Sequence, residues 1–373
     1  MRRLRGTSLV AGLMLAALIV SACSSSSNSS TSSSSSSGSS GGGKKVGLVF
    51  DIGGRGDKSF NDSAAQGLDK AKADFGLDTK DLSPAQGGQN RQELLQLLTT
   101  QGYPLVFAIG FAFADGVSAV SAANPNTKYA IVDDASMVCD SSASSAASTG
   151  PNPCRQNVAS LTFAEEQGSY LVGAAAALKS KANHIGFVGG VDTPLIKKFE
   201  AGYVAGAKKI NTNIKIDVKY LTEPPDFGGF SDPAKGNAAA TGMYDGGADI
   251  VYHAAGGSGT GVFQAARDYS SKTGTHVWAI GVDSDQYLSV GDASLQPFIL
   301  TSMEKHVNVA VYETIKDYVN GKLTTGSDRV FDLKNDGVGY ATSGGYVDDI
   351  KSQLDDLKQQ IIDGKITVPT TPS

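Results

Sequence analysis

Short apolar runs alternate with segments of helical periodicity along most of the chain. The runs predict strands at 46–50, 104–110, 128–133, 184–189, 249–253, 277–282 and 298–302. Between and after these runs, apolar residues recur every three or four positions, which predicts helices from 64, over 164–180, from 307 and over 347–361. Strands that alternate with helices form parallel sheets, so the pattern predicts an α/β fold.

The same local order of elements occurs twice. The stretch VGLVFDIGGRGDKSFND at 46–62 runs from a strand through a glycine loop into a helix, and HIGFVGGVD from residue 184 repeats that order. We interpret the two stretches as the starts of two doubly wound parallel-sheet domains. Ligands bind at the carboxyl ends of strands in such sheets, and a cleft between two domains commonly holds a small ligand.

The N-terminus has the features of an export signal. A basic start, RRLR at 2–5, precedes an apolar run at 9–20, which is shorter than the roughly 18 residues of a membrane-spanning helix. The sequence VSAC at 20–23 then matches a lipobox, which makes 1–22 a signal peptide and Cys23 the lipidated first residue of the mature chain. The alternative is an ordinary cleaved signal with a chance cysteine.

A serine- and glycine-rich segment follows. Such a composition cannot bury a core, so residues 23–43 are expected to form a flexible tether. The chain has a formal charge of −5, and removal of the signal peptide takes away three arginines and no acids, which lowers it to −8. This charge disfavours nucleic acid as a partner. No later segment is apolar enough to cross a membrane.

Two further cysteines, Cys139 and Cys154, flank a Ser/Ala/Pro-rich insert at 140–153. In an exported protein an even pair predicts a disulfide, here at the base of a surface loop, and two unpaired thiols are the alternative. The chain has no CxxC motif and its four histidines are scattered singly. We therefore expect neither a metal site nor a cofactor.

Residues with binding chemistry follow several predicted strands. They are Asp57, Phe60, Phe111, Asp115, Phe199, Gly256, Gly257, Asp283 and Lys305. Aromatic faces stack on flat rings, carboxylates accept hydrogen bonds from hydroxyls, and glycines let the backbone approach a ligand. Each residue also has a structural interpretation, as a core aromatic, a helix cap or a surface lysine. Their shared position favours a ligand with a flat ring and hydroxyl groups.

Six motifs, spread from residue 51 to 313, resemble those of a known family: DIGGRGDKSFND, AIGFAFAD, FVGGVDTPLIKKFEAGYVAGAKK, ADIVYHAAGGSGTGVFQAA, WAIGVDSDQ and TSMEKHVNVAVYE. The chain resembles the basic membrane protein family of bacterial substrate-binding lipoproteins, whose best understood members bind purine nucleosides for an ABC transporter. The resemblance implies a type I periplasmic binding fold of two lobes joined by three crossovers. We expect 44–160 and 285–320 in the first lobe, and 161–284 and 321–373 in the second.

The resemblance also implies roles for residues of the first lobe. Asp57 and Phe60 would face the ligand from the first loop, and Asp115 would lie on the purine edge close to Phe111. The chain departs from the family pattern at Gly56, because many relatives have asparagine before the aspartate of this loop. The departure removes a potential hydrogen bond to the ligand.

Four more residues complete the implied site. Phe199 would stack on the base, and Gly257 would line the pocket through its backbone. Asp283 and Lys305 would form the pair that holds the ribose hydroxyls, with Lys305 crossing back to the first lobe. In this prediction the ribose is held from both sides of the cleft.

The implied function is capture of a purine nucleoside outside the cytoplasm by a monomeric, non-catalytic lipoprotein, anchored in the cell membrane, that serves an ABC transporter permease. An enzyme is one alternative, because GGSGT at 256–260 approaches the GxSxG elbow of hydrolases. Thr260 replaces the final glycine, however, and no histidine and acid can be placed beside it. A same-fold binder of a sugar or autoinducer, and a ligand-sensing surface lipoprotein, stay open, since transport and sensing use the same lobe closure.

Overall fold

The computed structural model describes residues 44–139 and 151–372. The predicted signal peptide, the lipidation site Cys23, the whole tether and most of the insert lie outside these ranges. In the described residues the strands form two six-stranded sheets, which we call the first and the second sheet. Within the same residues, no helix combines the length and apolarity that crossing a membrane would need.

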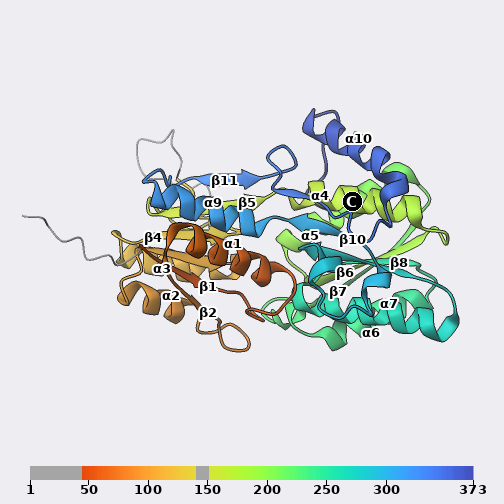
Figure 1. Cartoon of the computed structure of the whole chain (residues 1–373), viewed down its shortest axis with the longest axis horizontal. Coiled ribbons are helices and arrows are strands. Elements are labelled where there is room, and N and C mark those ends of the chain that lie inside the picture. Colours follow the sequence, from red (N-terminus) through yellow and green to blue (C-terminus); the bar gives the residue numbers. More distant parts are fainter. Residues whose placement is uncertain (1–43, 140–150, 373) are drawn as a thin grey trace, which may run out of the picture. The chain divides into compact units, whose positions relative to one another are not determined.

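The first sheet is parallel throughout, with the strand order β11-β5-β4-β3-β1-β2. Its strands are β1 (Lys45–Val49), β2 (Asp78–Leu82), β3 (Leu105–Ile109), β4 (Lys128–Val132), β5 (Val158–Phe163) and β11 (Asp328–Phe331). One face packs on α1 (Phe60–Phe75) and α9 (Val307–Val319), which lie side by side although far apart in sequence (Figure 1). The other face packs on α2 (Arg91–Thr100) and α3 (Ala114–Ala123). Helices on both faces make this a doubly wound lobe.

The second sheet has the order β12-β10-β9-β8-β6-β7, and only its edge strand β12 runs antiparallel. Its strands are β6 (His184–Val191), β7 (Lys215–Thr222), β8 (Ile250–Ala254), β9 (Trp278–Asp283), β10 (Ile299–Lys305) and β12 (Val338–Tyr340). The core on one face includes α4 (Glu165–Lys179), α5 (Pro194–Ile210) and α10 (Lys351–Ile362). On the other face lie α6 (Pro233–Asp245) and α7 (Gly259–Thr273). A short helix, α8 (Gln286–Ser289), follows β9.

The predicted fold class is confirmed, and the described chain passes between the lobes three times: from β5 to α4, from β10 to α9, and from β11 to β12. The predicted lobe boundaries are wrong in two places. β10 pairs with β9 in the second sheet instead of crossing to the first, and β11 pairs with β5 in the first sheet instead of the second. In both cases the crossover comes after the strand, so a short apolar run alone does not reveal which sheet it joins.

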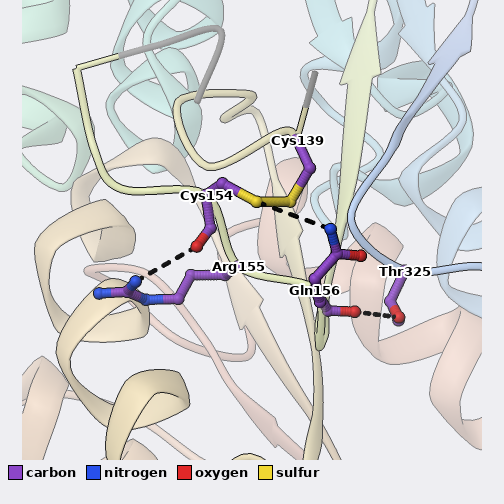
Figure 2. The surroundings of a disulfide bond; sticks show 5 residues. All are labelled: Cys139, Cys154, Arg155, Gln156 and Thr325. Atoms are coloured by element: carbon purple, nitrogen blue, oxygen red, sulfur yellow. Dashed lines mark hydrogen bonds between the residues drawn. A yellow bond between two sulfur atoms is a disulfide. The ribbon is translucent and has the colours of Figure 1, made fainter. Parts of the chain in front are cut away.

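The structure contains a disulfide between Cys139 and Cys154, whose Cα atoms are 4.9 Å apart (Figure 2). The backbone N–H of Cys139 donates to the carbonyl of Gly326 (2.9 Å), and the Thr325 hydroxyl donates to the carbonyl of Gln156 (2.6 Å). The bridge therefore closes the base of the insert and lies against the loop that leads into β11. It is the pair that the sequence predicts.

Candidate functional site

The carboxyl ends of the two sheets line one pocket. It encloses about 560 Å³ of atom-free space, part of it open to solvent. The lining residues are Asp51, Ile52, Asp57, Phe60, Asn61, Gly110, Phe111, Asp133, Leu195, Ile196, Phe199, Phe230, Ala254, Gly256, Val282, Asp283 and Lys305. Both lobes contribute apolar surface, aromatic rings and carboxylates.

Seven of the residues singled out from the sequence line this pocket, namely Asp57, Phe60, Phe111, Phe199, Gly256, Asp283 and Lys305. Asp115 does not: it is exposed in the first turn of α3 and is not among the lining residues. Gly257 is not among the lining residues either, and its neighbour Gly256 takes that place. A Cβ atom on Gly257 would lie 3.7 Å from the Cβ atom of Asp57, so this glycine lies against the first-lobe loop.

Asp57 has a structural role as well as a place in the lining. Its carboxylate accepts hydrogen bonds from the backbone N–H groups of Ser59 (3.0 Å), Asn61 (2.8 Å) and Asp62 (3.0 Å) at the start of α1. A carboxylate at a helix N-terminus satisfies free N–H groups and complements the helix dipole. Burial raises the pKa of Asp57 to about 6, although these hydrogen bonds favour the charged form.

Lys305 is the centre of a buried charge network. The residue is about 1% exposed, and its ammonium lies 2.7 Å from a carboxylate oxygen of Asp133 and 3.1 Å from one of Glu165. The other Glu165 oxygen lies 3.2 Å from the ammonium of Lys198. Burial acts to lower the pKa of Lys305, but the carboxylates of Asp133, Glu165 and Asp283 outweigh it and hold that pKa above its ordinary value. Lys305 is therefore charged when the protein is folded.

Lys305 and Asp283, the two residues that are predicted to hold the ribose together, have different direct partners in the structure. The ion pairs of Lys305 in the described chain are with Asp133 and Glu165, and Asp283 accepts a hydrogen bond of 2.6 Å from the Ser59 hydroxyl in the first lobe. Asp283 still contributes to the field around the lysine. Burial raises the pKa of Asp283, opposed by Lys305 and by the Ser59 hydrogen bond.

Two strand-end aspartates have left-handed backbone conformations. Asp133 follows β4 with φ of 70°, and Asp283 ends β9 with φ of 65°. Non-glycine residues adopt this region rarely, and strain of this kind gathers at functional sites. The two carboxylates, one from each lobe, both lie near the Lys305 ammonium and face the same pocket.

Aromatic rings of both lobes surround the same lysine. The Lys305 ammonium lies 5.1 Å from the ring centre of Phe60 on α1, 5.6 Å from that of Phe199 on α5 and 4.9 Å from that of Phe163. Phe60 and Phe199 also line the pocket. The site thus offers two ring faces from opposite lobes next to a charged, hydrogen-bonding cluster.

Sequence reasoning missed several lining residues. Asp133 directly follows a predicted strand and Asp51 follows another, so the rule that found Asp283 could have found them. Arg91 donates to Asp51 (2.8 Å), and the Asn61 amide accepts from the Asp51 backbone N–H (2.9 Å) and donates to the Ile52 carbonyl (3.2 Å). These contacts fix the glycine loop that forms one wall of the pocket.

Comparisons with known proteins agree with this architecture. The profile of the Bmp family, described as PnrA-like ABC transporter substrate-binding proteins, matches residues 44–372. The chain is 38% identical to the ABC transporter nucleoside-binding protein BmpA of Lactococcus lactis, over 87% of this chain and 89% of that protein. It is 35% identical to the CD4+ T-cell-stimulating antigen of Listeria monocytogenes, with 88% of each chain covered.

A solved structure is similar over nearly the whole folded part. An ABC transporter solute-binding protein from Aeropyrum pernix has a TM-score of 0.72 and 26% identity, covering 88% of this chain and 94% of its own. The family resemblance inferred from the six motifs is thereby confirmed. The chain belongs to the Bmp family of PnrA-like ABC transporter substrate-binding proteins.

Proposed function

We propose that the protein captures a purine nucleoside between its two lobes and delivers it to an ABC transporter permease. The observation that carries this proposal is that Phe60 and Phe199, one from each lobe, line the pocket beside the buried cluster of Asp133, Asp283 and Lys305. Two rings suit the faces of a flat base, and the charged groups suit ribose hydroxyls and ring N–H groups. A relative named for nucleoside binding, 38% identical, supports the same ligand class.

The ribose is assigned to Asp283 and Lys305 even though they do not pair directly. One oxygen of Asp283 is bonded to Ser59, and its other oxygen has no hydrogen-bond partner among the described residues. An ammonium has three donors, and the hydrogen bond to Asp133 (2.7 Å) engages one of those on Lys305, with Glu165 close by as an ion pair. One acceptor on Asp283 and donors on Lys305 are therefore available to a ligand.

The alternative of a hydrolase is disfavoured by the surroundings of Ser258 in the GGSGT stretch. Its hydroxyl is buried, donates to the Gly229 carbonyl (2.7 Å) and accepts from the Asp232 backbone N–H (2.7 Å). Both hydrogen bonds of this hydroxyl are to backbone groups, so the serine stabilises a loop and is not activated as a nucleophile. We propose a binding protein without catalysis, acting as a monomer.

The location proposed is the outer face of the cell membrane, with a lipid on Cys23 and residues 24–43 as tether. This follows from the lipobox and from the composition of the segment. A relative of Pyrococcus abyssi, 31% identical, is named as an uncharacterised lipoprotein.

Thermal unfolding tests the ligand class. A ligand that binds only the folded state raises the melting temperature by mass action. Adenosine, guanosine and inosine should each raise it, whereas glucose, ribose and galactose should leave it unchanged. A rise with a sugar and none with any nucleoside would reject the proposal in favour of a sugar-binding protein.

A further inference from the structure

The two lobes touch at a point far from their crossovers. The crossovers leave from β5, β10 and β11, which lie at one side of each sheet, whereas β2 and β7 are the edge strands of the opposite side (Figure 1). The loops that follow these edge strands, 83–90 and 223–232, therefore travel farthest when the lobes rotate about the crossovers. Contacts between the lobes on this side of the sheets depend on closure more strongly than contacts near the hinge.

Phe227 makes the contact at this outer edge. Its ring lies 5.9 Å from the Phe111 ring at an interplanar angle of 65°, the edge-to-face arrangement that aromatic pairs favour. The guanidinium of Arg91, directly after the 83–90 loop, lies 5.6 Å from the centre of the same ring. Phe227 of the second lobe thus contacts two residues of the first lobe at once.

The first-lobe side of the contact is rigidly held. Arg91 donates to the Asp51 carboxylate (2.8 Å) and to the Gly88 carbonyl (3.2 Å), and its guanidinium also lies 5.5 Å from the Phe113 ring centre. Burial raises the pKa of Asp51, opposed by its ion pair with Arg91. All of these contacts are made within the first lobe, so they hold the guanidinium independently of Phe227.

The second-lobe side is equally well ordered. The Thr222 hydroxyl donates to the Asp226 carbonyl (2.6 Å), and the Gly228 N–H donates to the Asp226 carboxylate (2.8 Å). Gly229 packs so closely on β6 that a Cβ atom there would lie 2.0 Å from the Gly190 carbonyl oxygen. The loop therefore presents Phe227 from a fixed base.

We propose that Phe227 is an interlobe clasp that holds the closed state and sets how long a bound ligand stays. Phe227 itself does not line the pocket, but Phe111 and the Arg91 partner Asp51 do. The clasp closes the pocket at that end without contributing a ligand contact of its own. The inference rests on the proposed capture of a small ligand between the lobes.

The dissociation rate of inosine tests the clasp. Labelled inosine bound to the protein is chased with unlabelled inosine, in wild type and in Phe227→Ala. One aromatic pair and one cation–π contact are lost, so the dissociation rate should rise about 10- to 30-fold while the association rate stays within about twofold. Phe227→Tyr, which keeps the ring, should dissociate like wild type.

A matched control is Phe298→Ala, because Phe298 is also half-buried in the second lobe but stacks on His276 and packs against a cluster of second-lobe residues. Its dissociation rate should equal that of wild type. An unchanged rate in Phe227→Ala, or an equal rise in Phe298→Ala, would overturn the clasp.

A second measurement needs no ligand. Spin labels at Leu97→Cys on α2 and Val218→Cys on β7, positions 42% and 41% exposed, report the distance between the lobes in a Cys23→Ser background. Adding Phe227→Ala should shift the pulsed-EPR distances of the protein as purified toward longer values. Identical distributions would overturn the clasp. If the shift occurs and inosine does not bind wild type, the clasp stands and the proposed ligand is wrong.

Discussion

At the scale of single residues, Asp283 is predicted to make the protein bind a nucleoside more tightly than the free base. A hydrogen bond to a charged group contributes about 1.5–3 kcal/mol, so Asp283→Ala should weaken nucleoside binding by roughly 10- to 150-fold and base binding little. Calorimetric titration of inosine and hypoxanthine into both proteins completes a double-mutant cycle. Asp285→Ala, a nearby carboxylate outside the pocket lining, is the control and should bind both ligands like wild type.

The same cycle can reject the assignment. If Asp283→Ala weakens binding of base and nucleoside equally, Asp283 is a structural residue held by Ser59 and not a ribose anchor. A 2′,3′-dideoxynucleoside gives an independent check, since wild type should bind it poorly when the buried carboxylate is left without its partners.

The buried side chain of His253 should make the free energy of unfolding depend on pH. Burial lowers its pKa to about 3, with a smaller opposing effect of Gln286, while the ordinary value is about 6.5. Between these values the unfolded chain binds a proton that the folded protein does not, so the free energy of unfolding falls as the pH falls from about 6.5 toward 3. From this group alone the loss between pH 7 and pH 4 is about 3 kcal/mol.

Denaturant unfolding at both pH values, in wild type and His253→Gln, isolates this contribution. All other acidic groups titrate in both proteins. The difference between wild type and variant in how the free energy of unfolding depends on pH therefore comes from residue 253. The variant should lose markedly less stability on acidification. Equal losses would show that His253 does not control the response to acid.

The sequence predicts part of the site, residue by residue. Placement just past strand ends located Asp57, Phe60, Phe199 and Asp283, because the carboxyl ends of parallel strands meet at one edge. The strand-end rule failed for Asp115 because this residue lies in the first turn of a helix. The direction of a side chain there depends on how the helix is oriented about its own axis, which the rule does not predict. Nor could it reveal the partners of a buried charge, which depend on strands far apart in sequence.

At the scale of elements, the pair α4 and α5 depends on glycine. A Cβ atom on Gly206 of α5 would lie 1.9 Å from the carbonyl oxygen of Tyr170 on α4. Gly206→Ala should therefore destabilise the protein by about 1–3 kcal/mol, because backbone must move to admit the methyl group. The measurement is the free energy of unfolding from denaturant titration.

Gly242 on α6 provides the matched control, since a Cβ atom there would meet no atom within 4 Å. Gly242→Ala should stabilise the protein by about 0.5–1 kcal/mol through helix propensity alone. If Gly206→Ala stabilises the protein to the same extent, the close approach of the two helices is not what holds this lobe together.

Elements with strongly apolar sequences were predictable, and others were not. The strands β3, β4, β6 and β8 are buried on both faces and read as apolar runs. The edge strands β2 and β7 are half-exposed and carry charged residues, as in DTKDL, so their sequences lack that signal. β5 was missed because polar Ser160 and Thr162 interrupt its apolar pattern.

At the scale of the whole molecule, chain order predicted two lobes but not their full membership. Long-range pairing decides whether β10 and β11 extend one sheet or the other, and no local pattern encodes that choice. α9 completes the first lobe by packing on α1 from more than 200 positions away in sequence. Interlobe contacts such as Phe111 with Phe227 likewise exist only in the folded chain.

Identification of the ligand retained by the protein tests the central claim most directly. The purified protein is incubated with an equimolar mixture of adenosine, guanosine, inosine, ribose, glucose and galactose, then desalted and denatured, and the released molecules are identified by mass spectrometry. A purine nucleoside should be recovered in about equal amount to the protein, with the sugars absent. Recovery of a sugar, or of no nucleoside, would contradict the proposed function.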